Sequence, residues 1–201
     1  MNRSAMTLRQ STLAAFLLAL TIAGCGSQTP AERPPLSGAT IGGPFTLIDK
    51  TGRQVRWSDF AGKYRVVYFG YAFCPDACPT DVATLMRGFD RFAKSQPRLA
   101  SQIQPIFITI DPARDTPSVV GEFAGAFSPQ LLGLTGTPAE VDAAAKAFAV
   151  YYSKGKETGG GYLMNHSRIA YLMGRKGEPI AMLPVDQNPE AVATELAKWV
   201  K

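Results

Sequence analysis

The chain has 201 residues, of which 46% are hydrophobic and 18% are charged, and its formal net charge is +5. This composition is that of an ordinary globular protein and excludes an intrinsically disordered chain. The length allows one domain with a tail. The basic surplus is mild and contains no dense cluster of lysine and arginine, which argues against a nucleic-acid-binding protein.

The first residues have the pattern of an export signal. Arg3 and Arg9 form a basic region, and an apolar run from Leu13 to Ala23 follows them. That run is too short to cross a bilayer as a mature helix. It leads through Gly24 directly into Cys25, and the four residues IAGC resemble a bacterial lipobox, in which the cysteine receives a lipid and becomes the new N-terminus. The alternative is an ordinary signal peptide with Cys25 as a passenger.

The lipobox predicts both the domain organisation and the compartment. We expect a lipoprotein signal peptide over residues 1–24, a flexible Pro-, Gly- and Ser-rich tether over 25–40, and one folded domain over 41–201. The domain would be lipid-anchored to a membrane of the bacterial cell envelope, on its exported side. Removing the two arginines of the signal lowers the formal net charge from +5 to +3. Two cysteines then remain, in an oxidising compartment.

The elements of the folded part alternate between strands and helices. Their hydrophobic periodicity and turn residues predict, in chain order, a hairpin over 43–49 and 53–57, a buried strand over 65–71, a helix over 79–94, a buried strand over 104–111, a helix over 117–127, a short strand over 131–135, a helix over 138–150, a closing hairpin over 168–174 and 178–183, and a helix over 189–200. This order predicts an α/β fold around a largely parallel sheet.

Several helices open with the same local pattern, a capping residue followed by proline. Thr116, Thr137 and Asn188 each precede a proline that can occupy the first helical position. Cys78 precedes Pro79 in the same way. Since a residue before proline disfavours the helical conformation, we expect Cys78 at the mouth of the helix, outside the helix proper.

The pair Cys74 and Cys78 is the first candidate for chemistry. It lies between the carboxyl end of a buried strand and the start of a helix, where α/β folds place their sites. The helix dipole favours thiolates there, although Asp76 and Asp81 oppose this effect. A disulfide that closes so small a loop contributes only about 2 kcal/mol, so redox exchange or metal binding fits the pair better than a structural staple.

The chain contains a single histidine, His166, immediately before a late strand. A surface histidine without a role is the simplest interpretation. In thioredoxin-like folds, however, the segment that enters this strand packs against the cysteine loop, so the imidazole would face the thiols. Two thiolates and one imidazole form a soft ligand set that selects Cu(I). Zinc is the competitor, but a closed structural zinc site needs a fourth ligand, which only Asp111 or Asp76 could supply.

Three segments together resemble the Sco/SenC family of thioredoxin-fold copper proteins. They are YFGYAFCPDACPTD at 68–81, FITIDPARDTP at 107–117 and YLMNHSRIAYLMGRKGEPI at 162–180. The resemblance extends over residues from about 41 to 200. It implies a thioredoxin-like α/β fold with a central, mostly parallel sheet flanked by helices and an N-terminal hairpin.

The resemblance also implies a ligand set and a function. By position, Cys74, Cys78 and His166 would bind copper, as Cu(I) or Cu(II), with Asp111 nearby as a supporting residue or an extra ligand. The protein would be a metallochaperone rather than an enzyme by turnover. It would take copper from an upstream donor and deliver it to the binuclear copper site of cytochrome c oxidase subunit II, or to another acceptor, from its lipid anchor.

The alternative is a thiol-disulfide oxidoreductase that uses Cys74 and Cys78 as a redox-active pair to reduce cysteines of that or another exported partner. A peroxidase fits less well, because the loop lacks the threonine or serine and the arginine expected around a peroxidatic cysteine.

Overall fold

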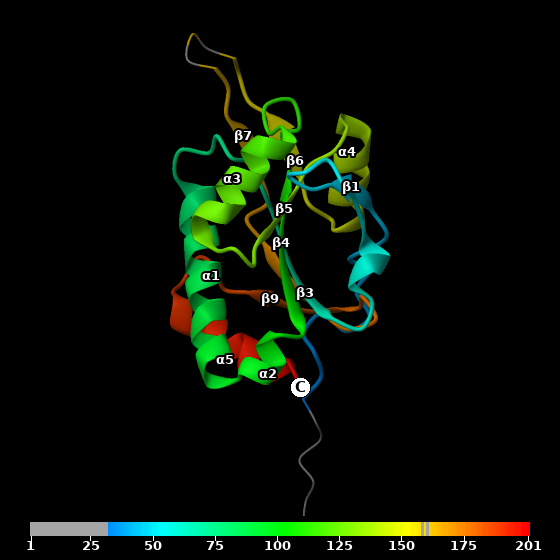
Figure 1. The fold of residues 1–201 in the computed structure, drawn as a ribbon, viewed down its shortest axis with the longest axis vertical. Coiled ribbons are helices and arrows are strands. Elements are labelled where there is room, and N and C mark those ends of the chain that lie inside the picture. Colours follow the sequence, from blue (N-terminus) through cyan, green and yellow to red (C-terminus); the bar gives the residue numbers. More distant parts are fainter. Residues whose placement is uncertain (1–31, 158, 160) are drawn as a thin grey trace, which may run out of the picture. The chain divides into compact units, whose positions relative to one another are not determined.

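The computed structural model describes residues 32–157, 159 and 161–201 (Figure 1). The predicted signal peptide, Cys25 and the first part of the predicted tether lie outside the described residues. The chain divides into two compact units, and the second, Pro34–Lys201, contains every helix and strand of the described part. Within this unit, the backbone N–H of Leu36 donates to the carbonyl of Ile180 at 3.0 Å, and its side chain packs against the core.

The core of the fold is a five-stranded mixed sheet in the order β5-β4-β3-β8-β9. The strands β3 (Tyr64–Gly70), β4 (Ile103–Thr109) and β5 (Leu132–Leu134) are parallel. The strands β8 (Ala170–Met173) and β9 (Pro179–Leu183) continue the sheet in antiparallel pairing. Every residue of β3 is buried, as expected for a central strand covered on both faces. The predicted thioredoxin-like α/β fold is confirmed.

Helices cover both faces of this sheet. The chain passes from β3 through α1 (Ala77–Ser95) to β4, and from β4 through α3 (Pro117–Phe127) to β5. Both crossovers run in the same direction across the sheet, so the right-handed rule places both helices on one face. Helix α5 (Pro189–Trp199) packs against α1 on that face, whereas α4 (Pro138–Ala147) lies on the other (Figure 1).

The alternation of side chains along β3 gives each face its own aromatic core. Tyr68 points toward α1, where its hydroxyl reaches Asp81, and its ring stacks with Phe107 at a centroid distance of 6.4 Å. The next residue, Phe69, contacts Phe148 at the end of α4 at 5.4 Å. Strand β3, which leads to the cysteine pair, is therefore packed against aromatic side chains on both of its faces.

The predicted N-terminal hairpin and three helix starts are confirmed. The hairpin is formed by β1 (Thr46–Ile48) and β2 (Gln54–Arg56). The side chains of Thr116, Thr137 and Asn188 each accept a hydrogen bond from the backbone N–H three residues later. At Thr137 the carboxylate of Glu140 also accepts from the Thr137 backbone N–H at 2.8 Å, which completes a capping box.

Some short elements were not predicted from the sequence. They are the 3-10 helix η1 (Trp57–Phe60), the helix α2 (Pro97–Ala100) and the hairpin formed by β6 (Tyr152–Lys154) and β7 (Met164–His166). Strands β6 and β7 form a two-stranded sheet of their own, separate from the five-stranded sheet. This separation matters because β7 ends at the single histidine.

The prediction that Cys78 lies outside the helix is wrong. Helix α1 begins at Ala77, with Asp76 in the capping position, so Cys78 and Pro79 both lie in its first turn. Proline is tolerated throughout that turn, because the first backbone N–H groups of a helix have no partner within the helix. A proline therefore places a helix start only to within a few residues. No helix of the described residues is both long and apolar enough to cross a membrane.

Candidate functional site

The two cysteines meet where the loop after β3 enters α1. Cys78 is fully buried, whereas Cys74 is partly exposed, and neither is in a disulfide. The backbone N–H of Cys78 donates to the Cys74 Sγ at 3.3 Å. The sulfur of Cys74 thus accepts a hydrogen bond from the first turn of α1, as the oxygen of a capping side chain would. The sequence analysis expected Cys78 to precede the helix as a capping residue. In the structure Cys78 lies inside the helix, and the side chain of Cys74 accepts the hydrogen bond from its backbone N–H.

His166 reaches the same point from the end of β7. Its Nε2 lies 3.2 Å from the Sγ of Cys78, across 88 positions of the sequence. Its Nδ1 lies 2.9 Å from the carbonyl oxygen of Ser167. Because a carbonyl only accepts, we assign the proton to Nδ1, which then donates to Ser167. In that tautomer the lone pair of Nε2 points at the thiol and is available to a metal ion.

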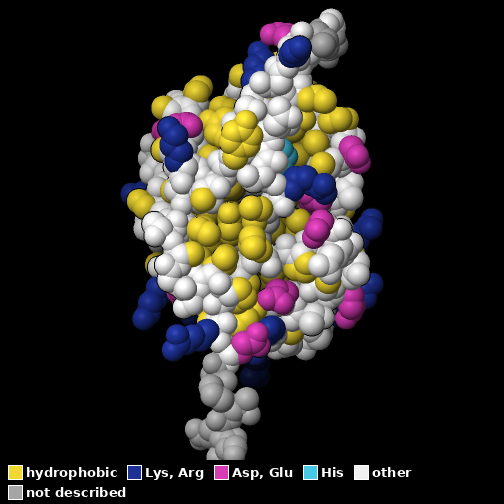
Figure 2. All heavy atoms as spheres, turned by 180° about the vertical axis from the view of Figure 1, so that it is seen from behind, with side chains coloured by type: hydrophobic (Ala, Val, Ile, Leu, Met, Phe, Trp, Pro, Cys, Tyr) yellow, Lys and Arg dark blue, Asp and Glu magenta, His cyan; other side chains and the backbone are white. Residues whose placement is uncertain are grey.

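Two tyrosines hold the imidazole ring between them. Tyr68 and Tyr71 contact His166 edge to face, with ring centroids 6.3 and 6.1 Å away. In Figure 2 only a small part of the histidine reaches the surface, between hydrophobic and basic side chains. Large exposed hydrophobic side chains are present on the neighbouring loops, Phe73 in the cysteine loop and Leu163 just before β7. The imidazole is thus in contact with aromatic side chains, and exposed hydrophobic side chains lie on the loops beside it.

The pKa values of the two thiols are shifted in opposite directions. Burial raises the pKa of the Cys78 thiol, and the nearby Cys74 and Asp81 raise it further. Burial also acts to raise the pKa of Cys74, but the hydrogen bonds from the backbone N–H groups of Cys78 and Asp76 outweigh it, and the pKa of Cys74 is lowered. The predicted preference for thiolates at the helix start therefore holds for Cys74 and is wrong for Cys78. Burial lowers the pKa of His166 and keeps the ring neutral.

The contacts among the predicted ligands are pairwise. Within residues 32–157, 159 and 161–201, no group of three or more His, Cys, Asp or Glu side chains is close enough together to hold a metal ion. Cys74 and His166 each contact Cys78, as described above. A three-ligand set would therefore require the side chains of Cys74 and His166 to turn toward one another.

Asp111 lies at the end of β4, but other side chains bind its carboxylate. The Nε of Arg114 donates to its Oδ2 at 2.5 Å, and the hydroxyl of Tyr162 donates to its Oδ1 at 2.8 Å. The guanidinium of Arg114 stacks on the ring of Tyr162 and also donates to the Tyr162 carbonyl at 2.9 Å. Asp111 therefore connects β4 to the segment before His166 and does not contact either cysteine.

Asp115 is a residue that the sequence analysis missed as part of the site. Its buried carboxylate accepts hydrogen bonds from the hydroxyl of Thr109 at 2.6 Å and from the backbone N–H of Ala72 at 2.9 Å. Ala72 lies two residues before Cys74, so Asp115 connects the cysteine loop to the end of β4. The segment DPARDTP gave the available signal, since it carries Asp111, Arg114 and Asp115 together.

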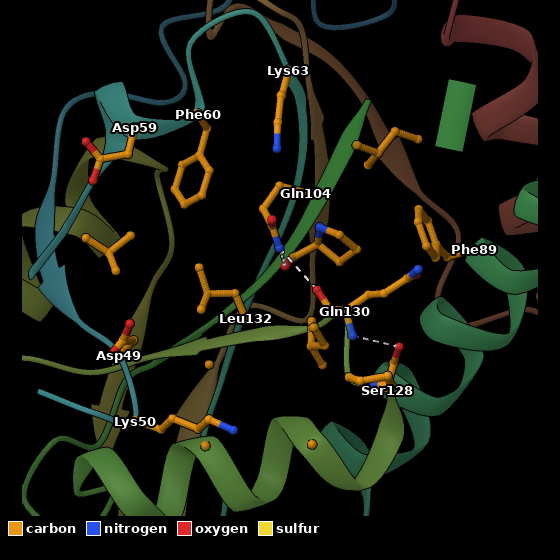
Figure 3. Close-up of a pocket in the computed structure, with 18 of the residues that line it drawn as sticks. Asp49, Lys50, Asp59, Phe60, Lys63, Phe89, Gln104, Ser128, Gln130 and Leu132 are labelled. Atoms are coloured by element: carbon orange, nitrogen blue, oxygen red, sulfur yellow. Dashed lines mark hydrogen bonds between the residues drawn. The ribbon is translucent and has the colours of Figure 1, made fainter. Parts of the chain in front are cut away.

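A well-formed cavity elsewhere in the fold contains none of these residues. It has a volume of about 640 Å³ and lies beside the amino-terminal ends of β4 and β5, with Lys50, Phe60, Lys63, Gln104 and Leu132 in its lining (Figure 3). The cysteines follow the carboxyl end of β3. The candidate site is therefore identified by the contact of sulfur and imidazole and not by this cavity.

Comparison with known proteins shows the family of the chain. The sequence pattern of the family described as SCO1/SenC matches residues 33–201. The chain belongs to the SCO1/SenC family. It is 37% identical over 202 residues to Protein SenC of Rhodobacter capsulatus, covering 96% of this chain and 90% of that protein. It is 36% identical over 162 residues to the human mitochondrial SCO1 homolog, covering 80% of this chain and 53% of that protein. The chain thus spans about half the length of this mitochondrial member.

Solved structures of the family share the fold. The structure of Arabidopsis thaliana ScoI with copper bound has a TM-score of 0.74 and 34% identity, covering 79% of this chain and 96% of that one. The structure of Bradyrhizobium japonicum ScoI with copper bound has a TM-score of 0.71 and 35% identity, covering 79% and 99%. The family match over residues 33–201 and the likeness to these two structures thus agree on a SCO1/SenC fold.

Proposed function

We propose that this SCO1/SenC protein binds copper through Cys74, Cys78 and His166 and delivers it to the binuclear copper site of cytochrome c oxidase subunit II. The observation that carries the proposal is the contact of 3.2 Å between the Sγ of Cys78 and the Nε2 of the only histidine. Solved relatives described as having copper bound support the choice of metal.

The chemistry of the donor atoms favours copper over zinc. Two sulfurs and one imidazole nitrogen suit Cu(I), which accepts soft ligands. A closed zinc site needs a fourth ligand. Both carboxylate oxygens of Asp111, one of the two candidates for a fourth ligand, are already hydrogen-bonded by Arg114 and Tyr162. Because copper is a cargo here, a site that leaves one side open to a partner is suited to release.

The proposed location follows from the N-terminal sequence. Residues 1–24 would direct export, and Cys25 would carry the lipid that anchors the domain to the exported side of a bacterial membrane. There the chain would receive copper from an upstream donor and meet an exported copper-binding domain of the oxidase.

The direct test is a transfer experiment. The reduced chain is loaded anaerobically with Cu(I) and mixed with a purified, reduced, metal-free copper-binding domain of subunit II, and the metal in each protein is measured after separation. We expect copper to move to the acceptor from the wild-type chain. A chain that binds copper but keeps it when the acceptor is in excess would contradict delivery.

A thiol-disulfide reductase is the second candidate, and the difference between the cysteines favours it. Cys74 is partly exposed with a lowered pKa, and Cys78 lies behind it. The Cys74 thiolate would attack a partner disulfide and form a mixed disulfide, releasing one partner thiolate. Cys78 would then attack Cys74, releasing the second partner thiol and leaving a Cys74–Cys78 disulfide, so two electrons pass to the partner.

Metal-free protein separates the two candidates. The reductase predicts that the reduced, copper-free chain reduces an oxidised acceptor stoichiometrically and that His166→Ala retains this activity. The chaperone predicts that His166→Ala abolishes copper transfer even when the acceptor is supplied already reduced.

A further inference from the structure

We propose that the ion pair between Asp81 and Arg168 is a positioning device that holds His166 against Cys78. In this role neither side chain acts on the sulfur or imidazole atoms directly. The ion pair acts through the backbone that joins Asp81 to Cys78 and Arg168 to His166. The proposal rests on the proposed copper site, because the contact that it positions is the one between two of the three proposed ligands.

The carboxylate of Asp81 is completely buried and has three donors. The guanidinium of Arg168 donates from Nη2 to Oδ1 at 2.6 Å and from Nε to Oδ2 at 2.9 Å. The hydroxyl of Tyr68 donates to Oδ2 at 2.8 Å. This two-pronged geometry, which only arginine provides, sets the direction as well as the distance between the partners.

The ion pair joins the two segments that carry the proposed ligands. Asp81 lies one turn after Cys78 on α1, and Arg168 lies two residues after His166. The contact between Cys78 and His166 joins the same two segments. The segment from Cys78 to Asp81 and the segment from His166 to Arg168 are therefore joined at both ends, by the Cys78–His166 contact at one end and by the ion pair at the other.

Ser167, between His166 and Arg168, links the ion pair to the imidazole. Its carbonyl accepts the proposed hydrogen bond from Nδ1 of His166 at 2.9 Å. Its backbone N–H donates to the carbonyl of Tyr151 at 2.9 Å. The position of this peptide determines which ring nitrogen faces Cys78. Anchoring Arg168 to α1 thus selects the tautomer that offers Nε2 to the thiol.

The topology explains why such an anchor is needed. Among the residues that the structure describes, β7 pairs only with β6, so no ladder of backbone hydrogen bonds joins His166 to the five-stranded sheet that precedes Cys78. Only the carboxylate of this pair is buried, since the Arg168 side chain is 47% exposed, and the desolvation of a buried carboxylate offsets much of the attraction. The buried carboxylate of Asp81 is better explained by its effect on geometry, because it fixes the position of the segment after β7 relative to α1.

The test compares Asp81→Asn and Arg168→Lys with the wild-type chain. Asp81→Asn removes the negative charge, and Arg168→Lys keeps the positive charge, and with it the fold, but loses the two-pronged geometry. Asp49→Asn is the matched control, because Asp49 is also buried and pairs with Arg53, but it lies in the β1–β2 turn. The tautomer of His166 is read from the imidazole ¹⁵N shifts of the reduced, metal-free chain, and Cu(I) affinity from competition with a chelator.

We expect both site variants to show a mixture of imidazole tautomers and to lose about tenfold in Cu(I) affinity, toward the lower end of the range for residues that orient a ligand. The Asp49→Asn control should lose stability only. The proposal is overturned if folded Asp81→Asn and Arg168→Lys keep the wild-type tautomer and affinity. If the wild-type chain binds no Cu(I), the proposed function fails, and the tautomer of the metal-free variants still decides whether the ion pair positions His166.

Discussion

At the scale of single residues, Cys74 and Cys78 have similar sequence contexts but different environments in the fold. Each precedes a proline, but Cys74 is partly exposed at the entrance of α1 and Cys78 is buried within its first turn. Hydrogen bonds lower the pKa of the first thiol, and burial raises the pKa of the second. Cys74 is therefore the sulfur that a partner meets first.

Alkylation rates test this asymmetry. The reduced wild-type chain is treated briefly with iodoacetamide at pH 7, and the modified peptides are quantified by mass spectrometry. Because the thiolate is the nucleophile, we expect Cys74 to react at least about tenfold faster than Cys78 in the folded protein. In urea the two rates should become similar. Equal rates in the folded protein would show that the environments do not differ as described.

The partly buried imidazole of His166 gives a pH dependence with a definite sign. Burial lowers the pKa of His166 in the folded state, so in the window below its ordinary pKa the unfolded chain binds a proton that the folded chain does not. The free energy of unfolding should therefore decrease as the pH falls through this window, and the effect should vanish above it.

The measurement is urea unfolding of the metal-free, reduced chain at several values between pH 7.5 and pH 5, alongside His166→Gln. The wild-type chain should lose more stability than the variant over this interval. Parallel pH profiles for the two proteins would mean that His166 titrates in the folded state as it does in the unfolded state.

At the scale of elements, helix starts were predictable where a capping side chain precedes proline. Thr137 is the clearest case, with its capping box to Glu140. Cys78 resembled these starts, but the structure begins α1 earlier because proline fits any position of a first turn. The hairpin of β6 and β7 was missed because a long connection, residues 155–163, separates its two short strands, so no tight-turn signal marks them as a pair.

The contacts that complete the site could not be predicted from local patterns. Asp81 and Arg168 are 87 positions apart, and each alone is an ordinary charged residue in its segment. By contrast, Cys74 and Cys78 could be chosen from residue type and spacing, and His166 from its place before a late strand together with the resemblance to the Sco/SenC family. Sequence patterns thus identified the candidate ligands, whereas the fold was needed to identify what orients them.

The capping box of α4 yields a stability prediction. Thr137→Ala removes the hydroxyl that accepts from the backbone N–H of Glu140, and should lower the free energy of unfolding by about 1 kcal/mol. Thr194→Ala, at an exposed position inside α5, is the control and should change stability little. Chemical denaturation measures both. A loss at Thr194 as large as that at Thr137 would remove the argument for the cap.

At the scale of the whole molecule, α1 and α5 pack closely against each other and cover one face of the sheet. Cys78 lies in the first turn of α1 in this helical layer. Gly88 in α1 allows the close packing, because a Cβ at this position would lie 2.5 Å from the Cβ of Val192 and 2.8 Å from the carbonyl oxygen of Pro189. This layer includes α1, on which both Cys78 and Asp81 lie.

Gly88→Ala should therefore destabilise the protein by about 1–3 kcal/mol through overpacking, despite the better helix propensity of alanine. Gly125→Ala in α3 is the matched control, since a Cβ there would meet no atom within 4 Å. Urea midpoints of the two variants give the comparison. A Gly88→Ala chain as stable as Gly125→Ala would contradict the described packing of α1 on α5.

The central claim is that Cys74, Cys78 and His166 form one copper site, and an anaerobic Cu(I) titration of the reduced chain against a competing chelator tests it most directly. We expect one tightly bound Cu(I) per chain. Cys74→Ala, Cys78→Ala and His166→Ala should each weaken binding by more than the roughly 10–100-fold typical for residues that only orient a ligand. A His166→Ala chain with wild-type affinity for Cu(I) would contradict the three-ligand site.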